Sequence, residues 1–569
     1  MENVILINHQ KVAYFSMEIA LEDSLPTYAG GLGVLAGDTV RAAADLGVPM
    51  VAVTLLHRKG YFRQKLTQGG DQIEEADGWQ VEDFCQEMSP HVQIDVEGRS
   101  VFVRAWRYTV EGIHHSKLDV YLLDTDLAVN SKKDRELCDY LYGGDSYYRF
   151  CQEMILGIAG VRMLNALGYH SITVYHMNEG HSSLLTLELL QQYIRLRGKG
   201  SFDREDLEAI HKKCVFTTHT PVAAGHDQFP MEMVHKILGK YCFQDKEKIF
   251  CQGNTLNLTY LGMTMSRFIN GVAKRHGEVA QDLFSHYKID SITNGVHAPS
   301  WVGPAMSALF DQYIPLWRED YFSLRYALSI SLEEIWQAHL QQKRTLLEKV
   351  KSLTGETFDE NALTIGFARR ATAYKRHDMI FHDLERLKQI VMNNGPLQLI
   401  FSGKAHPHDI SGKKLIKSVF HAAQNLKEVI KVVYLEDYDI SLAKILVSGV
   451  DVWLNNPEPP LEASGTSGMK AALNGIPSLS ILDGWWIEGC IEGVTGWSIG
   501  ENHKSNSQLV EYSKDANSLY DQLENKVMPS FYQDRTKFMA IMRSAIALNG
   551  SFFNTHRMIQ QYVQKAYFR

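Results

Sequence analysis

The fold class of this chain is decided by residues 363–403, which read LTIGFARRATAYKRHDMIFHDLERLKQIVMNNGPLQLIFSG. Two short apolar runs, 363–368 and 397–403, have the composition of buried strands. Between them, RHDMIFHDLERLKQIV (376–391) has the spacing of apolar residues that predicts a helix. A strand, a helix and a second strand joined by short loops predict a parallel βαβ unit.

The same alternation continues toward the C-terminus. We expect helices over 410–426 and 441–449, and strands over 429–436, 450–456 and 477–482. Repeated units of this kind predict a doubly wound α/β fold, in which ligands bind at the carboxyl ends of the strands.

The first half shows this pattern with interruptions. A strand over 12–19, a glycine turn opening a helix over 34–47, and a strand over 48–57 come first. We interpret the next residues as an irregular insert. From about residue 145 the pattern restarts with a long helix, and we then expect strands over 172–178, 213–220 and 289–296, with a helix over 182–194.

Bulk properties exclude several classes of protein. A chain of 569 residues is too long for one hydrophobic core, so we expect two or three domains with a cleft between them. The net charge of -8 provides no general attraction to nucleic acid or anionic membranes. No apolar stretch is long enough for a signal peptide or a membrane span. The seven cysteines are scattered and never form CxxC, which favours a reducing cytoplasm over a disulfide scaffold or a zinc site.

One short motif carries specific chemistry: LEASGTSGMKAALNG, residues 461–475, follows a predicted strand and opens a helical pattern. Small residues let the backbone approach a ligand closely, and free N–H groups at a helix start can hold a phosphate. Lys470 could therefore condense with an aldehyde cofactor as a Schiff base. The alternative is a Gly/Ser turn followed by a solvated lysine, and spacing alone does not decide between them.

A cluster of cations follows the first strand of the opening stretch. Arg369, Arg370, Lys375 and Arg376 lie where an α/β fold usually binds anions. The alternative is a solvated helix face, an interpretation that is strongest for Arg376.

The glycine turn YAGGLGVLAGD, residues 28–38, could form an anion-binding backbone nest at Gly30, Gly31 and Gly33. Such a turn is more often structural, and the dinucleotide pattern GxGxxG is not reproduced. His181 and His219 lie in HMNEGHSS (176–183) and TTHTPVAAGHDQFP (217–230), and each could be an ordinary core or loop histidine. The two histidines of HPH, residues 406–408, lack converging ligands, so no metal site is predicted.

Taken together, these motifs resemble those of the glycogen and α-glucan phosphorylases. The match includes EASGT before Lys470 and Asn-Gly after it, and LDGWWIEG (482–489) looks like the shorter bacterial branch. The resemblance spans residues of about 12 to 490. It implies two Rossmann-like domains facing a cleft, which we place at residues 1–300 and 301–535, and a helical segment at 536–569 that packs back on the first domain. It also implies a homodimer and the lack of the regulatory N-terminal extension of longer relatives.

The resemblance assigns roles to single residues. Lys470 would carry pyridoxal phosphate, and the residues expected around this cofactor are Thr466, Ser467, Arg369, Tyr438 and Gly31. Those expected to bind the substrate phosphate are Gly31, Arg370 and Lys375. Those expected to contact the sugar are His181, His219, Asn294 (in SITNGVHAPSW, 291–301), Glu462, Ser464 and Gly465. The catalytic set is Lys470, Arg370, Lys375 and His219.

The implied reaction is cleavage of α-glucan by inorganic phosphate to glucose 1-phosphate, with retained configuration and the cofactor phosphate as a proton relay. One position departs from the longer relatives, because Asp439 stands after Tyr438 where they place an arginine near the cofactor phosphate. Two rivals remain. A nucleotide-sugar glucosyltransferase such as glycogen synthase shares the GGLG turn but leaves EASGTSGMK unexplained. A non-catalytic glucan-binding homologue is disfavoured by the presence of Lys470, Arg370 and Lys375.

Overall fold

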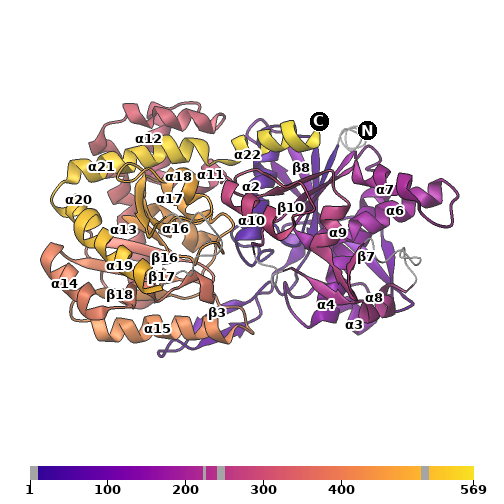
Figure 1. The fold of residues 1–569 in the computed structure, drawn as a ribbon, viewed down its shortest axis with the longest axis horizontal. Coiled ribbons are helices and arrows are strands. Elements are labelled where there is room, and N and C mark those ends of the chain that lie inside the picture. The colour runs from indigo at the N-terminus through magenta and orange to yellow at the C-terminus, as the bar shows by residue number, and fades with distance from the viewer. Residues whose placement is uncertain (1–10, 222–225, 240–249, 502–511, 569) are drawn as a thin grey trace.

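The computed structural model describes residues 11–221, 226–239, 250–501 and 512–568. The chain forms a mixed α/β structure whose two halves lie side by side, each around its own parallel sheet (Figure 1). No helix in these described ranges is long and apolar enough to cross a membrane.

The C-terminal half is built on a six-stranded sheet in the order β18-β17-β16-β19-β20-β21, with every neighbouring pair parallel. The strands are β16 (Leu363–Ala368), β17 (Leu397–Ser402), β18 (Lys431–Leu435), β19 (Val452–Asn455), β20 (Ser478–Ile481) and β21 (Gly496–Ile499). The first five confirm the strands predicted from sequence. All six residues of β16 are buried, as expected for a strand covered by helices on both faces.

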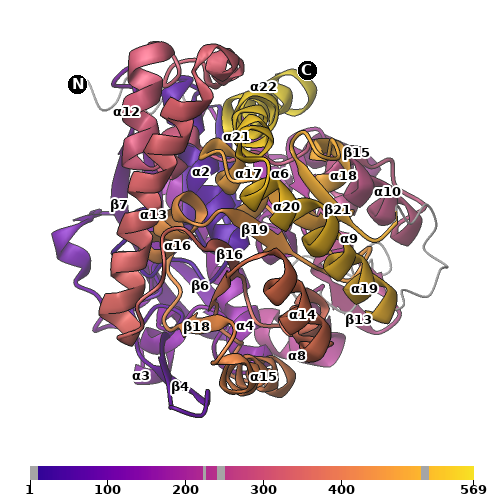
Figure 2. The same ribbon diagram turned by 90° about the vertical axis from the view of Figure 1, so that its left-hand side faces the viewer.

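The helices of this half surround the sheet (Figure 2). They include α13 (Leu332–Thr354), α14 (Leu384–Asn394), α15 (Ile410–Leu426), α16 (Ile440–Gly449) and α17 (Ser467–Leu473). The prediction of one helix over 376–391 was wrong at its start. Asp383 caps α14 by accepting a hydrogen bond from the backbone N–H of Arg386 at 2.9 Å, and Arg376 has a left-handed φ of 52°.

The N-terminal half is built on a larger sheet in the order β15-β14-β10-β9-β1-β2-β8-β7-β5, with β6 paired to β7. The parallel part contains β15 (Asp290–Ser291), β14 (Phe268–Gly271), β10 (Cys214–Thr217), β9 (Val174–Asn178), β1 (Val12–Ser16), β2 (Met50–Leu55) and β8 (Lys117–Asp124). The antiparallel part contains β7 (Arg99–Glu111), β5 (Gln86–Glu87) and β6 (Val92–Val96).

The expectation of an irregular insert after residue 57 was wrong. Strands β5 to β8 fold there and extend the sheet, and β7 alone spans 13 residues. Its sequence carries the signal, since Val101, Val103 and Ala105 are buried while the alternating Phe102 and Arg104 are partly exposed. That period of two is typical of a half-buried strand.

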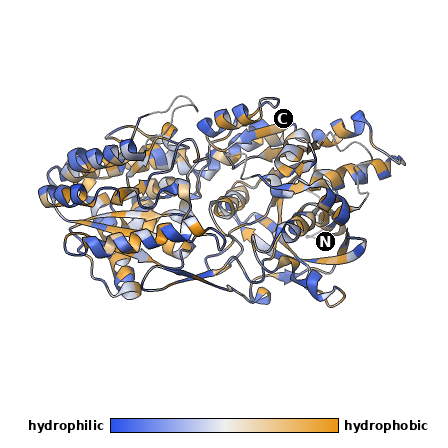
Figure 3. Cartoon of the chain, turned by 60° about the horizontal axis from the view of Figure 1, so that its bottom comes forward, coloured by the Kyte–Doolittle hydropathy of each residue, from blue (hydrophilic) through white to orange (hydrophobic). Residues whose placement is uncertain are grey.

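Apolar residues fill both halves. In β1, Ala13 and Phe15 belong to one buried cluster and Val12 and Tyr14 to another, so this strand is buried on both faces. Figure 3 shows the same partition, with hydrophobic colour concentrated in the strands of both halves and both colours on the helices.

Two segments tie the halves together. The hairpin of β3 (Arg63–Leu66) and β4 (Gln72–Glu75) reaches under the C-terminal half (Figure 1), where the backbone N–H of Gln64 donates to Oδ1 of Asp437 at 2.9 Å. At the chain's end, α22 (Thr555–Tyr562) returns to the N-terminal half, where Asn270 donates to the hydroxyl of Tyr562 at 3.0 Å. Residues of the two halves can therefore share one site.

Candidate active site

Lys470 lies in α17 and is almost fully buried, with 8% of the residue exposed. Its Nζ lies 3.8 Å from the ring centroid of Trp301, at the end of α11 (Ala298–Trp301). Burial lowers the pKa of Lys470 to about 8. Among the described residues, no hydrogen bond or ion pair involves this Nζ. The interpretation of Lys470 as a solvated lysine is therefore wrong, and its amine is suited to condense with an aldehyde.

Glu462 gathers two of the predicted cations. Nη2 of Arg369 donates to its Oε2 at 2.5 Å, and Nζ of Lys375 donates to the same oxygen. Burial alone would raise the pKa of Glu462, but the charges and hydrogen bonds of the two cations outweigh it and lower the pKa to about 2. These side chains meet because β16 and β19 are parallel neighbours, so the loops after both strands lie at one edge of the sheet.

Arg370 differs from its neighbours because, within the described ranges, its guanidinium has no hydrogen bond or ion pair. Arg370 is exposed to solvent, but its guanidinium lies close to side chains of both halves. Burial lowers its pKa, but the nearby Tyr374, Tyr61, Tyr142 and Glu18 together raise it above the ordinary arginine value. Glu18, Tyr61 and Tyr142 belong to the N-terminal half, so Arg370 faces the other half with its charge available to an anion.

Arg376 is part of the structure rather than a solvated face, which corrects the favoured interpretation of that residue. Only 4% of Arg376 is exposed. Its Nη1 lies 2.8 Å from Oδ2 of Asp515, and its other nitrogens donate to the backbone carbonyls of Asn456 and Pro457.

The glycine turn opens α2 (Gly31–Asp45) beside the buried carboxylate of Glu18. Oε2 of Glu18 accepts the backbone N–H of Ala29 at 2.6 Å and that of Gly30 at 3.2 Å. A Cβ on Gly33 would lie 2.6 Å from the same oxygen, so packing requires glycine there. A Cβ on Gly31 would meet no atom within 4 Å. Gly31 therefore borders open space, as a position beside a ligand does.

The N-terminal half contributes the histidines. The backbone N–H of His219 donates to Oε2 of Glu179 at 2.7 Å, and its Nε2 lies 2.5 Å from Oδ1 of Asn178. Burial lowers the pKa of His219 to about 4, so the ring is neutral. Nε2 of His181 lies 3.2 Å from Oδ2 of Asp227. Glu179, which the sequence did not single out, has a left-handed φ of 74°, a strain that clusters at functional sites.

Four buried polar atoms at predicted site residues have no hydrogen-bond partner among the described residues. They are Nδ1 of His181, Oδ1 of Asn294, Oγ of Ser464 and Nη1 of Arg369. An unpaired buried polar atom costs about 1–3 kcal/mol, so such atoms mark where a ligand can bind.

The remaining predicted residues lie in two loops and at the start of α17. Gly465 has a φ of 80°, which glycine adopts without strain, and Thr466 is the N-cap residue of α17 but makes no side-chain capping hydrogen bond. Oγ of Ser467 accepts from Nε1 of Trp453 at 3.0 Å. Burial raises the pKa of Tyr438, and the charge of Arg369 acts against it.

Asp439 has a local role that the sequence comparison did not reveal. Its Oδ1 accepts the backbone N–H of Leu442 at 2.7 Å, so it caps α16. The spacing from Asp439 to Leu442 is that of a helix N-cap, a signal present in the sequence. The residue that departs from longer relatives thus stabilises a helix start.

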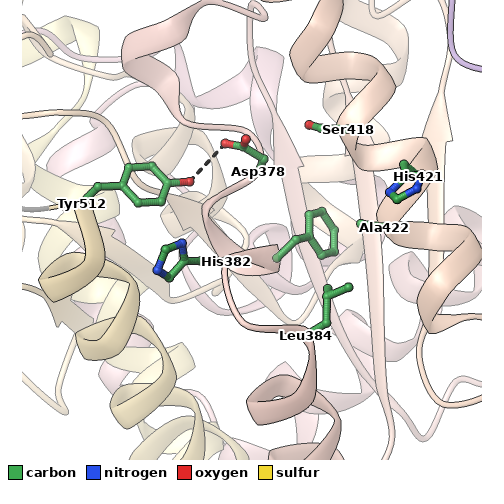
Figure 4. Close-up of a pocket in the computed structure, with 8 residues that line it drawn as sticks. Asp378, His382, Leu384, Ser418, His421, Ala422 and Tyr512 are labelled. Carbon is green, nitrogen blue, oxygen red and sulfur yellow. Dashed lines mark hydrogen bonds between the residues drawn. The ribbon is translucent and has the colours of Figure 1, made fainter.

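A separate hollow on the C-terminal half lies between α15, the turn after Arg376 and α19 (Tyr512–Gln522) (Figure 4). The hydroxyl of Tyr512 donates to Oδ1 of Asp378 at 3.1 Å across it. None of the predicted site residues lines this hollow.

Comparison with known proteins agrees with the motifs. Residues 243–496, which contain Arg370, Glu462 and Lys470, match the carbohydrate phosphorylase family. The maltodextrin phosphorylase of Thermococcus litoralis is 40% identical over 596 aligned residues, which cover 98% of this chain and 70% of that protein. The chain belongs to the carbohydrate phosphorylase family.

Two glycogen phosphorylases support the same assignment. That of Aquifex aeolicus is 36% identical, covering 98% of this phosphorylase chain and 86% of its own. That of Mycobacterium tuberculosis is 36% identical over an alignment that covers 98% of this chain and 70% of that protein. Membership makes this phosphorylase a glycosyltransferase with α-glucan phosphorylase activity, as the motif at Lys470 predicted.

Proposed function

We propose that this phosphorylase removes terminal glucose from α-1,4-linked glucans such as glycogen or maltodextrin by retaining attack of inorganic phosphate, with pyridoxal phosphate on Lys470. The product is α-glucose 1-phosphate. The observation that carries this proposal is the state of Lys470: a buried amine with a pKa of about 8, on the ring of Trp301 and without a partner among the described residues.

The residues around Lys470 fit a phosphorylated aldehyde cofactor. Arg369 has a buried, unpaired Nη1, and Gly31 borders open space. With these two, the residues that hold the cofactor are Lys470, Thr466, Ser467 and Tyr438. When bound, pyridoxal phosphate supplies a phosphate group that exchanges a proton with the substrate phosphate. Lys470 anchors the cofactor, and Arg369 offsets its negative charge.

Arg370 and Lys375 hold the substrate phosphate, with the backbone at Gly31. Arg370 is ready for an anion, whereas Lys375 is paired with Glu462. An arriving phosphate therefore takes over part of the charge of Lys375 and frees the Glu462 carboxylate to accept hydrogen bonds from sugar hydroxyls. The same two cations offset the repulsion between the substrate and cofactor phosphates.

The glucosyl unit lies against the neutral side of the site. Asn294 and Ser464 offer unpaired polar atoms for its hydroxyls, and Gly465 lets the backbone approach. His181 and His219 complete the contacts. The His219 ring is neutral near pH 7, so it adds no positive charge where the sugar develops its own, and the backbone carbonyl of His219 offsets that charge.

The proposal extends to the architecture. Each sheet, with its helices, corresponds to a Rossmann-like domain, residues 1–300 and 301–535, and the segment 536–569 spans both. The packing of α22 against α2 supports this division. We expect the working form to be a cytoplasmic homodimer. In the described part of the chain, Cys85, Cys138, Cys151, Cys214 and Cys490 are free thiols, and Cys242 lies outside it.

The test is an assay of maltooligosaccharides of graded length with inorganic phosphate, scored for glucose 1-phosphate. Parallel reactions use ADP-glucose as donor or omit phosphate. We expect glucose 1-phosphate to form only with phosphate, and Lys470→Arg, which keeps a cation, to be inactive. Glucose incorporation from ADP-glucose without phosphate-dependent release would show the synthase-like rival instead. Glucan binding without any turnover would show the non-catalytic one.

A further inference from the structure

Asp38 is a buried carboxylate that no step of the proposed reaction uses. It lies on α2, the helix that begins at Gly31, and only 1% of it is exposed. Its Oδ2 accepts Nε1–H of Trp301 at 2.8 Å and the backbone N–H of His297 at 3.2 Å. Its nearest cation is Arg41, whose Nη1 lies 3.9 Å from Oδ1. Asp38 thus joins the helix of the glycine turn to the segment that carries Trp301.

Through Trp301, Asp38 reaches Lys470. The face of the indole lies 3.8 Å from Nζ of Lys470, where a cation is attracted to the ring. A carboxylate that accepts the indole N–H fixes the plane of that ring and increases the electron density on its face. Burial lowers the pKa of Lys470 to about 8, and the negative charge of Asp38 opposes part of this decrease. The position of the Trp301 ring and the negative charge of Asp38 therefore both favour the positively charged form of the Lys470 nitrogen.

We propose that Asp38 is the positioning residue of Lys470: it holds the Trp301 ring against the lysine and favours positive charge on its nitrogen, free or linked to the cofactor. This inference rests on the proposed cofactor role of Lys470. It gives α2 two functions, since the helix borders the phosphate site at Gly31 and supports the cofactor lysine at Asp38.

The same helix supplies a matched control. Asp45 lies at the other end of α2, and its Oδ2 accepts Nε2 of His297 at 2.9 Å and the hydroxyl of Tyr321 at 2.8 Å. It therefore binds the same 297–301 segment, but through the His297 ring instead of Trp301. Asp45→Asn removes a buried charge from this helix without touching the indole.

The experiment compares wild type, Asp38→Asn and Asp45→Asn. The amide of Asp38→Asn keeps an acceptor oxygen for Trp301 and removes the negative charge. After removal of the cofactor, the pH dependence of Lys470 acetylation by acetic anhydride is followed by peptide mass spectrometry. We expect a midpoint near pH 8 in wild type, a midpoint lower by ~1 unit in Asp38→Asn, and no change in Asp45→Asn. An unchanged midpoint in folded Asp38→Asn would overturn the inference.

A second variant keeps the inference testable if Asp38→Asn does not fold. Trp301→Phe breaks the same hydrogen bond while the carboxylate and an aromatic ring remain. We expect it to release pyridoxal phosphate on dialysis about tenfold faster than wild type, an effect of roughly 1.4 kcal/mol. Release at the wild-type rate would contradict the positioning role. A wild-type protein that carries no pyridoxal phosphate would instead refute the proposed function, while the acetylation midpoints would still test the effect of Asp38.

Discussion

The two halves of the molecule bring opposite chemistry to the site. The predicted cations all come from the C-terminal half: Arg369, Arg370, Lys375 and Lys470. The N-terminal half contributes a glycine turn and histidines, of which His219 is held neutral by burial. The difference places the positive charge proposed to hold the phosphate groups in one half and the neutral histidines proposed to contact the sugar in the other.

Glu462 shows how the charged side is kept stable. Two buried cations without a counter-charge would be costly to fold, and the carboxylate that offsets part of their charge comes from the same half. Arg370 is left out of this arrangement. The charged half thus contains two cations that share one carboxylate and, in Arg370, a cation without an ion pair among the described residues. Variants of each half should fail in different ways.

The largest effect is expected at Lys470. Lys470→Ala removes the amine that anchors the cofactor, so phosphorolysis should be lost even with added pyridoxal phosphate. Its fold should persist, because this Nζ has no hydrogen bond or ion pair among the described residues. Glucose 1-phosphate assays and thermal unfolding test both expectations. Substantial activity in this variant would contradict the anchoring role.

Arg370 and Arg376 lie in one segment, but only Arg376 has an ion pair among the described residues, so their variants should fail differently. Arg370→Ala should lower kcat/KM for phosphate by roughly 10²–10³-fold and leave the melting temperature close to wild type. Arg376→Ala leaves Asp515 buried without its partner and should lower the free energy of unfolding by about 3–5 kcal/mol. Phosphate kinetics and chemical denaturation separate the two. Equal loss of stability in both would mean that Arg370 is a structural residue.

Gly31 and Gly33 make the corresponding comparison in the N-terminal half. Gly31→Ala adds a methyl group to open space, so it should preserve stability and raise KM for phosphate by roughly tenfold, a loss of about 1.4 kcal/mol. Gly33→Ala places a Cβ 2.6 Å from Oε2 of Glu18 and should lower the free energy of unfolding by about 1–3 kcal/mol. The reverse pattern would mean that Gly31 does not face the phosphates.

Acid sensitivity should also differ between the two halves. Burial lowers the pKa of six histidines in the described part of the N-terminal half: His211, His226, His176 (to about 3), and His57, His219 and His276 (to about 4). Because the unfolded chain binds their protons near pH 6.5 and the folded chain does not, stability is full above that pH.

As the pH falls from about 6.5 toward 4, each such histidine should remove about 1.4 kcal/mol of stability per pH unit. In the C-terminal half, His377 has a comparably lowered pKa, of about 3. Hydrogen exchange at pH 7, 6 and 5 should therefore show the N-terminal sheet opening first. Simultaneous opening of both sheets would mean that the buried histidines do not set this difference.

The fold could be predicted where strands are buried on both faces, because β16, β17 and β20 are short, fully buried segments rich in apolar residues and separated by helices and short loops. Strand β7 was missed although Val101 and Val103 alternate with partly exposed residues, since the strand lies outside any βαβ unit. The start of α14 was misplaced because the helical pattern extends before the Asp383 cap.

The sequence motifs predicted which residues belong to the candidate site but not the contacts between them. The structure brings Arg369, Lys375 and Glu462 together, although nothing in the spacing of these residues indicates an ion pair. Asp38 and Trp301 were not singled out either, because the contacts of Trp301 with Asp38 and with Lys470 depend on how distant segments pack together. Contacts between distant segments are set by tertiary structure, and local patterns do not contain them.

The central claim is that Lys470 carries pyridoxal phosphate. Borohydride reduction of the purified protein, followed by proteolysis and peptide mass spectrometry, tests it most directly. The account predicts a pyridoxyl group on the peptide that contains Lys470 and on no other lysine peptide. Active protein that carries no pyridoxyl group, or carries it on a different lysine, would contradict it.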